Sequence, residues 1–256
     1  MEIQRWIFVF MISNIRYFFF AGVVFLYCYV FFKEKMINRK IQAKFPKHGA
    51  IYYEIFYSFI TSLLLATTVA LLTAPAIRTH THLYFRVDEF GWTYFFASIL
   101  GVILIHDSYF YWMHRAIHHP VLYRSIHRVH HHSTNPTPWA SFSFHPIEGI
   151  LEIIIIPILT FVFPLHPAAL GIFILFMTAY NVYGHSGFEI YPTWFNKHPV
   201  FKWLNTSVNH NMHHKYFKGN YGLYFRFWDE WMGTTHQDYD QTFEKITKKK
   251  NVVHRL

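Results

Sequence analysis

Long runs of apolar residues separated by short polar stretches dominate the chain. The first run covers residues 6–32, the second covers 55–77, and the third begins at Trp92 and passes near Ile105 into the more polar segment HDSYFYWMHR. A run of about 20 apolar residues is long enough to cross the roughly 30 Å hydrocarbon core of a bilayer. The pattern therefore predicts transmembrane helices.

A fourth apolar region, 147–183, is interrupted by Pro157, Pro164 and Pro167. Its length suits two spans that form a hairpin and turn near Pro164, and the chain from His185 onward is too polar to cross. We predict an all-α integral membrane bundle of about four transmembrane helices, with a cytoplasmic, histidine-rich helical cap. A cleaved signal peptide is the alternative for the first run, but no small-residue cleavage pattern precedes Lys33.

Composition agrees with a membrane protein, since 53% of the residues are apolar and only 14% are charged, against about 25% charged in soluble domains. The formal charge of +9 raises the possibility of nucleic-acid binding, but the basic residues flank apolar runs instead of forming one face. The single cysteine, Cys28, excludes a four-thiolate zinc site and a cysteine-ligated iron–sulfur cluster.

Basic residues also predict the orientation, because cytoplasmic loops carry an excess of lysine and arginine. Residues 33–50 and 237–256 are strongly basic, whereas the 78–91 loop balances two arginines against Asp88 and Glu89. The basic segments should therefore face the cytoplasm and the 78–91 loop the opposite side. This arrangement brings residues 106–145 and 185–256 together on the cytoplasmic face of an ER or bacterial inner membrane.

The chain contains 20 histidines, and three short motifs hold many of them: HRAIHH (114–119), HRVHHH (127–132) and HNMHH (210–214). Within each motif, histidines three or four residues apart point from one face of a helix. The spaced sets are His114 with His118; His127 with His130 and His131; and His210 with His213 and His214. Neutral imidazoles gathered in a small space leave lone pairs unsatisfied without a metal, and so many nitrogen ligands suit two metal ions better than one.

These motifs, in this order between hydrophobic spans, resemble the histidine boxes of the fatty acid hydroxylase and sterol desaturase superfamily. The flanking segments DSYFYWMHR, FHPIE, HSGFE and NYGLYFRFWDEWMGT are similar to members on the sterol-desaturase side. The resemblance covers residues 100–236. It implies a membrane-embedded helical fold with a non-haem di-iron centre that uses O₂ to hydroxylate or desaturate a lipid. It also divides the chain into a membrane anchor with two spans (1–95), a catalytic domain (96–240) and a basic cytoplasmic tail (241–256).

The same resemblance implies the metal ligands. Carried over by motif, the ligand and catalytic set is His114, His118, His127, His130, His131, His185, His210, His213 and His214. His119 is an alternative or additional ligand to His118, because some members space the first box one residue wider. His145 in FHPIE is either a further ligand or a hydrogen-bond donor to one.

Three other residues are predicted to support the ligands. Asp107 and Tyr111 precede His114 on the same helix face and either orient ligand rings or bond to each other. Asn181 stands where fatty acid hydroxylases have a histidine four residues before His185, a departure that points away from sphingolipid-type 2-hydroxylases. His106 and His132 are expected outside the ligand set. His80 and His82 are excluded because they fall across the membrane.

The expected activity is that of an oxidoreductase, a monooxygenase-type enzyme acting on a sterol-like, fatty acyl or alkyl lipid with two iron ions and O₂; zinc, which imidazole also binds well, is expected in overexpressed protein. The chain has no Gly-x-Gly-x-x-Gly fingerprint, so a separate reductase, ferredoxin or cytochrome must supply electrons. A histidine-rich metal transporter would place ionisable residues at mid-membrane. A membrane zinc hydrolase needs an acid–base carboxylate, but no His-Glu-x-x-His is present.

Overall fold

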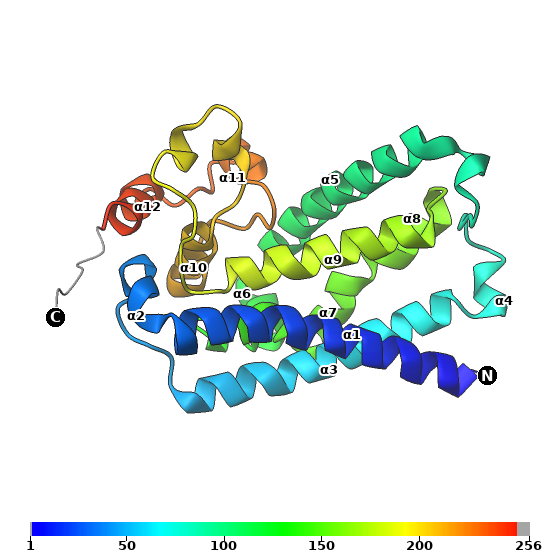
Figure 1. Cartoon of the computed structure of the whole chain (residues 1–256), viewed down its shortest axis with the longest axis horizontal. Coiled ribbons are helices and arrows are strands. Elements are labelled where there is room, and N and C mark those ends of the chain that lie inside the picture. Colours follow the sequence, from blue (N-terminus) through cyan, green and yellow to red (C-terminus); the bar gives the residue numbers. More distant parts are fainter. Residues whose placement is uncertain (1, 250–256) are drawn as a thin grey trace.

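The computed structural model describes residues 2–249 and is built almost entirely of helices (Figure 1). Within those residues, extended pairing is limited to isolated bridges. The α-helices are α1 (Glu2–Phe25), α2 (Lys33–Met36), α3 (His48–Leu72), α4 (Pro75–Arg78), α5 (Gly91–Ile117), α6 (Pro120–Leu122), α7 (Pro146–Ile153), α8 (Ile155–Val162), α9 (Pro167–Gly184), α10 (Ser207–Tyr216), α11 (Phe227–Trp231) and α12 (Tyr239–Thr247). The π and 3₁₀ segments are η1 (Leu26–Phe31), η2 (Ile37–Arg39), η3 (Val87–Glu89), η4 (Tyr123–His127), η5 (His130–His132), η6 (Pro138–Phe142), η7 (Phe195–Lys197) and η8 (Phe201–Trp203).

Four helical segments are long and apolar enough to cross a membrane: Ile3–Phe31, which joins α1 to η1, and helices α3, α5 and α9. Large apolar side chains stay exposed on their outer faces, and Phe8, Phe19 and Leu100 are each more than 60% exposed (63%, 62% and 64%). Continuous apolar surface of this kind marks a membrane or protein contact. The prediction of an all-α membrane bundle with about four spans is confirmed.

The predicted apolar runs differ from the helices in two places. Helix α5 continues without a break through HDSYFYWMHR to Ile117, so its polar end carries the first histidine motif. The first half of the predicted hairpin is two helices of eight residues each, α7 and α8, which meet at Ile154. Pro157 explains the break, because it has no N–H to bond the carbonyl of Ile153.

Different segments of the chain pack against the two ends of the bundle. At one end, the loop that follows α4 meets the turn between α8 and α9: the backbone N–H of His82 donates to Thr160 O at 2.8 Å, and Leu165 N donates to His82 O. At the other end, Ile41 N donates to Gly187 O, and Gln42 donates to Thr134 O at 2.8 Å and to Asn211 Oδ1 at 3.0 Å. The segment after α2 therefore lies against both histidine-rich regions.

Three apolar clusters hold the described residues together, and the smallest joins α5 to α9 through Phe95, Ile99 and Ala169. The main cluster joins residues of α1, α3, α5, α8 and α9, from Tyr17 to Tyr224. A smaller cluster packs α10 against α12, with Val208 and Met212 facing Phe243 and Ile246. The predicted tail, 241–256, therefore begins inside a packed helix, and residues 250–256 lie outside the described residues. The division at residue 95 stays a prediction.

Glu189 fixes the start of α10. Its carboxylate is fully buried and accepts hydrogen bonds from Tyr183 Oη at 2.8 Å, Tyr191 N at 2.9 Å and Val208 N at 3.1 Å. Burial raises the pKa of Glu189 to about 7, and the hydrogen bonds oppose that shift. A carboxylate near a helix N-terminus satisfies free N–H groups and faces the positive end of the helix dipole. Glu189 thereby positions the helix that carries the last histidine motif.

Candidate metal centre

Nine histidine side chains meet at the end of the bundle where α5, α9 and α10 converge. They form two groups, and within each group the nitrogen atoms that can bind a metal lie within 4.8 Å of one another. The larger group is His114, His118, His127, His131 and His213; the smaller group is His130, His185, His210 and His214. We call these the five-histidine and the four-histidine group. Their members are the same nine residues that the family resemblance implies.

The two groups divide each of the later motifs. In α10, His210 and His214 are four residues apart and join the four-histidine group, whereas His213 turns to the five-histidine group. Neighbouring residues of an α-helix point about 100° apart, so a helix that lies between the groups can serve both. The expectation that each motif presents all its histidines to one face is therefore too simple.

The second motif is divided for a different reason, because it is not an α-helix. A π segment ends at His127 and a 3₁₀ segment follows from His130 to His132. This change of helix type sends His127 and His131 to the five-histidine group and His130 to the other. Short π and 3₁₀ segments are common at functional sites for this reason.

The ring nitrogens approach closely in both groups. In the five-histidine group, the Nε2 atoms of His118 and His127 lie 2.9 Å apart, and those of His131 and His213 lie 3.0 Å apart. In the four-histidine group, His185 Nε2 lies 2.9 Å from His210 Nε2. Eight of the nine side chains are buried, and His118 is half-buried.

Hydrogen bonds at Nδ1, the other nitrogen of each ring, show why the close contacts between Nε2 atoms call for a cation. His114 Nδ1 lies 2.9 Å from the carbonyl of Tyr221, and His127 Nδ1 lies 2.6 Å from Glu148 Oε1. A carbonyl can only accept, so His114 Nδ1 carries the hydrogen and the neutral ring has a lone pair on Nε2. An ionised Glu148 fixes the same tautomer in His127, whereas burial raises the pKa of that carboxyl group well above its usual range. The Nε2 atoms of His114 and His127 are 3.2 Å apart. Two lone pairs cannot bond each other, and a cation between them resolves the contact.

The four-histidine group repeats this pattern. His185 Nδ1 lies 2.8 Å from Asn181 O, His214 Nδ1 lies 3.0 Å from Ser133 O, and their Nε2 atoms face each other at 3.2 Å. Both donor sets therefore fit a metal ion bound through Nε2. Imidazole nitrogen is a ligand that iron, zinc and copper share.

Lowered pKa values keep the histidine rings neutral. Burial lowers the pKa of His118 to about 2, with a further contribution from the nearby His114, and lowers that of His185 to about 4. Burial and neighbouring rings also hold the pKa values of the remaining ligands from η5 and α10 well below the usual range: His130, His131, His210, His213 and His214. Neutral imidazole is the form that binds metals.

Glu148 is an acidic residue at the rings that was not proposed from the sequence. Its carboxylate bonds His127, and both side chains are buried. A carboxylate on the far nitrogen fixes the ring and strengthens it as a ligand. The signal was present, because FHPIE places an acidic residue at the start of an apolar segment.

Two of the other predicted ligands belong to neither group. His119 is exposed and follows α5 at the surface. His145 caps α7: its Nδ1 accepts a hydrogen bond from Ile147 N at 3.3 Å. His132, expected outside the ligand set, packs its ring against Tyr53. His80 and His82 are exposed at the opposite end of the bundle.

The predicted supporting residues Asp107 and Tyr111 bond the segment that follows α10, the first through its backbone and the second through a side chain. Asp107 accepts hydrogen bonds from the backbone N–H groups of Tyr224, at 2.7 Å, and Phe225. Tyr111 bonds Thr234 Oγ1 at 3.0 Å. Neither touches a histidine of the groups or the other. Both instead anchor the segment that follows α10, whose carbonyls bond the ligand rings. Asn181 supports His185 directly, through its backbone carbonyl.

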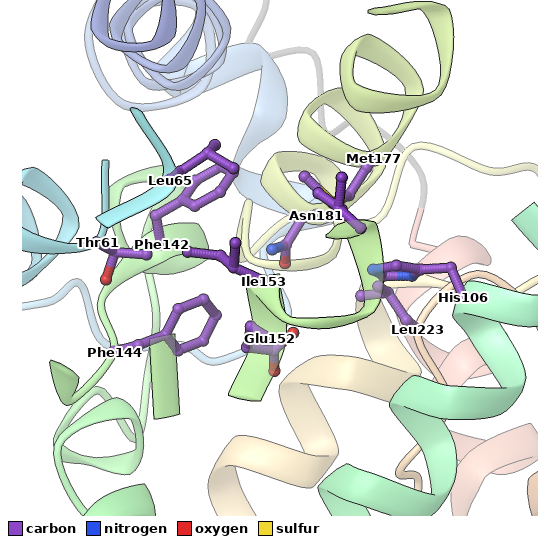
Figure 2. A pocket seen from close by; sticks show the side chains of 11 residues that line it. Thr61, Leu65, His106, Phe142, Phe144, Glu152, Ile153, Met177, Asn181 and Leu223 are labelled. Carbon is purple, nitrogen blue, oxygen red and sulfur yellow. The ribbon is translucent and has the colours of Figure 1, made fainter. Parts of the chain in front are cut away.

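Two internal cavities adjoin the histidines. One touches both groups, and the other is mostly apolar; both are narrow. Phe144, Glu152 and Asn181 line both, so the two cavities meet at these side chains. Figure 2 shows the apolar cavity, with side chains from α3, α5, α7 and α9 directed into it.

A family model for fatty acid hydroxylases matches residues 99–234, a range that includes both histidine groups. The chain belongs to the fatty acid hydroxylase family. It is 36% identical over 156 residues to lathosterol oxidase of Rattus norvegicus, an alignment that covers 60% of this chain and 50% of the relative. It is 34% identical over 187 residues to a Delta(7)-sterol 5(6)-desaturase of Aspergillus fumigatus, covering 70% and 50%.

A third relative of the fatty acid hydroxylase family, a Delta(7)-sterol 5(6)-desaturase of Gibberella zeae, is 31% identical over 170 residues, covering 65% of this chain and 51% of the relative. The chain thus spans about half the length of the curated relatives it matches. No solved structure matches it significantly. The resemblance to the sterol-desaturase side of the fatty acid hydroxylase superfamily is confirmed.

Proposed function

We propose that the protein is a membrane-bound, O₂-dependent di-iron oxidoreductase that hydroxylates or desaturates a C–H bond of a lipid. One observation carries the proposal: nine histidines lie in two groups with facing Nε2 lone pairs, at the end of helices long enough to cross a membrane. An unactivated C–H bond has no acidic proton, so side-chain acid–base groups alone do not cleave it. Such chemistry belongs to a metal cofactor.

The five-histidine group would hold one iron and the four-histidine group the other. Bound iron supplies the activation of O₂ and the removal of hydrogen from the lipid. The protein keeps the rings neutral by burial and fixes their direction through Nδ1, with Glu148 holding His127. Phe110 and Phe144 line the cavity against the histidines and keep water away from it. The cavity lining positions the lipid carbon.

The names of the relatives and the apolar cavity together support a sterol-like lipid as substrate. The relatives are named as sterol desaturases and lathosterol oxidase. The cavity beside the histidine groups is lined mainly by aliphatic and aromatic side chains, among them Leu65, Phe142, Ile153 and Leu223. We propose that the substrate enters this space from the bilayer.

A separate reductase, ferredoxin or cytochrome is the proposed electron donor. A groove with an empty volume of about 1090 Å³ opens beside the five-histidine group, and Arg115, Lys218 and His236 line it. Gly219 and Tyr221 also line it, and their carbonyls accept hydrogen bonds from the rings of His213 and His114. The basic lining suits an acidic donor surface, and these carbonyls link the groove to the rings.

We place the histidine end on the cytoplasmic face of an ER or bacterial inner membrane, because the basic 33–50 segment lies at that end. Cysteine labelling tests this placement. In a Cys28→Ser background, Lys44→Cys should react from the cytoplasmic side and Glu89→Cys from the other side. Labelling of both from one side would contradict the topology.

The rival functions make different predictions in one experiment. Purified protein should contain two iron ions per chain, with zinc replacing part of them after overexpression, and membranes with a donor system should consume O₂ and convert a sterol. A transporter would move metal without changing lipid, and a zinc hydrolase would act without O₂. The site favours neither rival, because its ligands lie at helix ends and bind through many nitrogens. One metal per active chain would contradict the di-iron proposal.

A further inference from the structure

The apolar cavity beside the metal centre contains polar side chains that the proposed metal chemistry does not use. Thr61 enters it from α3, His106 from α5 and Glu152 from α7, among mostly apolar neighbours (Figure 2). The cavity is narrow and leaves room for little more than a water molecule, although the space between its lining atoms is about 390 Å³. A lipid would have to displace flexible walls such as Met177.

These polar side chains lack protein partners. Thr61 Oγ1 and His106 Nδ1 are buried without a hydrogen-bond partner. The His106 side chain is only 2% exposed, and its ring contacts Phe173 and Tyr224. Within residues 2–249, the carboxyl group of Glu152 also has no hydrogen-bond or ionic partner. Unsatisfied polar groups are costly in an apolar interior and are usually paired with a ligand or an ordered water molecule.

Glu152 has a further significance because of its position. It lines both cavities, and the second of these is walled by His114, His127 and His130. Glu148, which bonds His127, lies one helical turn earlier on α7. A group bound by Glu152 is therefore held close to the place where the proposed oxidation occurs.

The hydrogen-bonding capacity of Glu152 and His106 indicates which chemical group would bind there. Burial raises the pKa of the Glu152 carboxyl group to about 8, so near neutral pH it is mostly protonated and both donates and accepts hydrogen bonds, as a neutral imidazole does. A hydroxyl group also donates one hydrogen bond and accepts others, so it can pair with either side chain. An ammonium group, which only donates, would leave the histidine N–H unpaired, and a hydrocarbon would satisfy neither side chain.

We propose that Glu152 and His106 form a binding subsite for a hydroxyl group of the lipid substrate, placed near the carbon that reacts. The inference rests on the proposed function and narrows its substrate class to lipid alcohols, such as sterols, with the hydroxyl close to the oxidised carbon. Thr61 lies on the opposite wall and has a free hydroxyl of its own for a bound water or the same group.

The test compares two probes, lathosterol and the same sterol without its 3-hydroxyl group. Membranes containing the protein and a donor system are assayed for turnover, and purified zinc-loaded protein is assayed for binding of each probe by competition. Wild type should prefer the hydroxylated probe at least about tenfold in both assays, because the probe without it leaves buried polar groups unpaired. Glu152→Leu should reduce that preference to about twofold or less, whereas Glu152→Gln should keep most of it.

His106→Phe provides a second variant in case Glu152→Leu does not fold, and His82→Phe is the matched control at the opposite end of the bundle. His106→Phe should also reduce the preference, with metal content unchanged, and His82→Phe should leave it intact. Equal binding of both probes by wild type, or an unchanged preference in Glu152→Leu and His106→Phe, would overturn the subsite and indicate that the cavity holds only water. Equal turnover of both probes would leave the proposed oxidation standing, whereas selective binding without any O₂-dependent product would contradict the oxidation and keep the subsite.

Discussion

Histidines occur at both ends of the helical bundle, yet the two ends use them differently. At the end that holds the two groups, His114 and His185 are buried and donate from Nδ1 to carbonyls. At the opposite end, His82 is exposed, and His166 caps α9 by accepting from Ala168 N while its other nitrogen lies 3.2 Å from Phe85 O. Both nitrogens of the His166 ring are therefore used in hydrogen bonds, and no lone pair is left for a metal.

This difference shows that the number of histidines does not define a metal site. What matters is an acceptor behind most of the rings, which fixes the tautomer and directs a lone pair into a shared space; His131, whose Nδ1 has no partner, is an exception. The acceptors are mostly backbone carbonyls. Asp107 anchors the segment that provides two of them, and Glu189 anchors the start of α10, which provides three of the rings. Four changes test this account: replacement of a ligand, a lower pH, replacement of an acceptor and reversal of a surface charge.

The largest effect is expected from loss of a ligand. His214→Ala removes a buried nitrogen of the four-histidine group, so activity should disappear and the metal content should fall below two per chain. Metal analysis and a lipid assay on the same preparation measure both. His82→Ala, at the opposite end, should change neither. Full activity of His214→Ala would show that the four-histidine group is not a metal site.

Acid should destabilise the metal-free protein. The pKa of His185 is lowered to about 4 by burial, while an unfolded histidine titrates near 6.5. The unfolded chain therefore binds more protons below pH 6.5, and the stability contributed by each such ring is complete above that pH. It should fall by about 1.4 kcal/mol per pH unit between 6.5 and 4. The melting temperature of the metal-free protein should fall across this range, whereas bound metal should be retained until the pH approaches 4, because the folded rings stay neutral. A melting temperature that does not change between pH 6.5 and 4 would contradict the burial of a neutral His185.

Loss of an acceptor should weaken the site without abolishing it. Glu148→Gln keeps the shape of the side chain but removes the charge that faces His127, so metal affinity or activity should fall about 10–100-fold. Metal competition with a chelator measures the affinity. Glu34→Gln, an exposed change of the same kind, is the control. If the two variants behave alike, the carboxylate behind the ring is not important.

The smallest effect is expected at the groove. Lys218→Glu reverses a charge on its lining, and the KM for an acidic electron donor should rise several-fold at low salt, with the difference shrinking as ionic strength increases. Lys47→Glu makes the same change away from the groove and should have little effect. Equal changes in both variants would indicate a general charge effect in place of a docking site.

The sequence predicted the fold and the members of the candidate site better than the arrangement of the site. Runs of apolar residues reveal membrane-spanning helices because length and hydropathy are local properties. The motifs reveal eight of the nine histidines because spacing is local too, whereas His185 came from the family resemblance. The division of His210 and His213 between groups depends on where α10 lies relative to η5, which is a tertiary property.

Residues that act through long-range contacts were the hardest to predict. Asp107 was expected to orient a ring and instead binds a backbone segment more than a hundred residues away. Glu148 and Glu152 were hidden in an apolar stretch, where acidic residues are easily taken for a polar helix face. Their roles depend on which neighbours the folded chain provides, His127 for the first and a cavity for the second.

The division of ligands between the groups has a consequence for biosynthesis. Each group takes at least one ring from α10, so neither group is complete until residues 210–214 have been made. Chains are synthesised from the N-terminus at about 5–20 residues per second, and His114 must therefore wait for its partners for several seconds after it leaves the ribosome. The segment around Gln42 was made earlier still, yet it contacts Asn211. Completion of the two histidine groups is thus a late event, which follows synthesis of the helices that surround them.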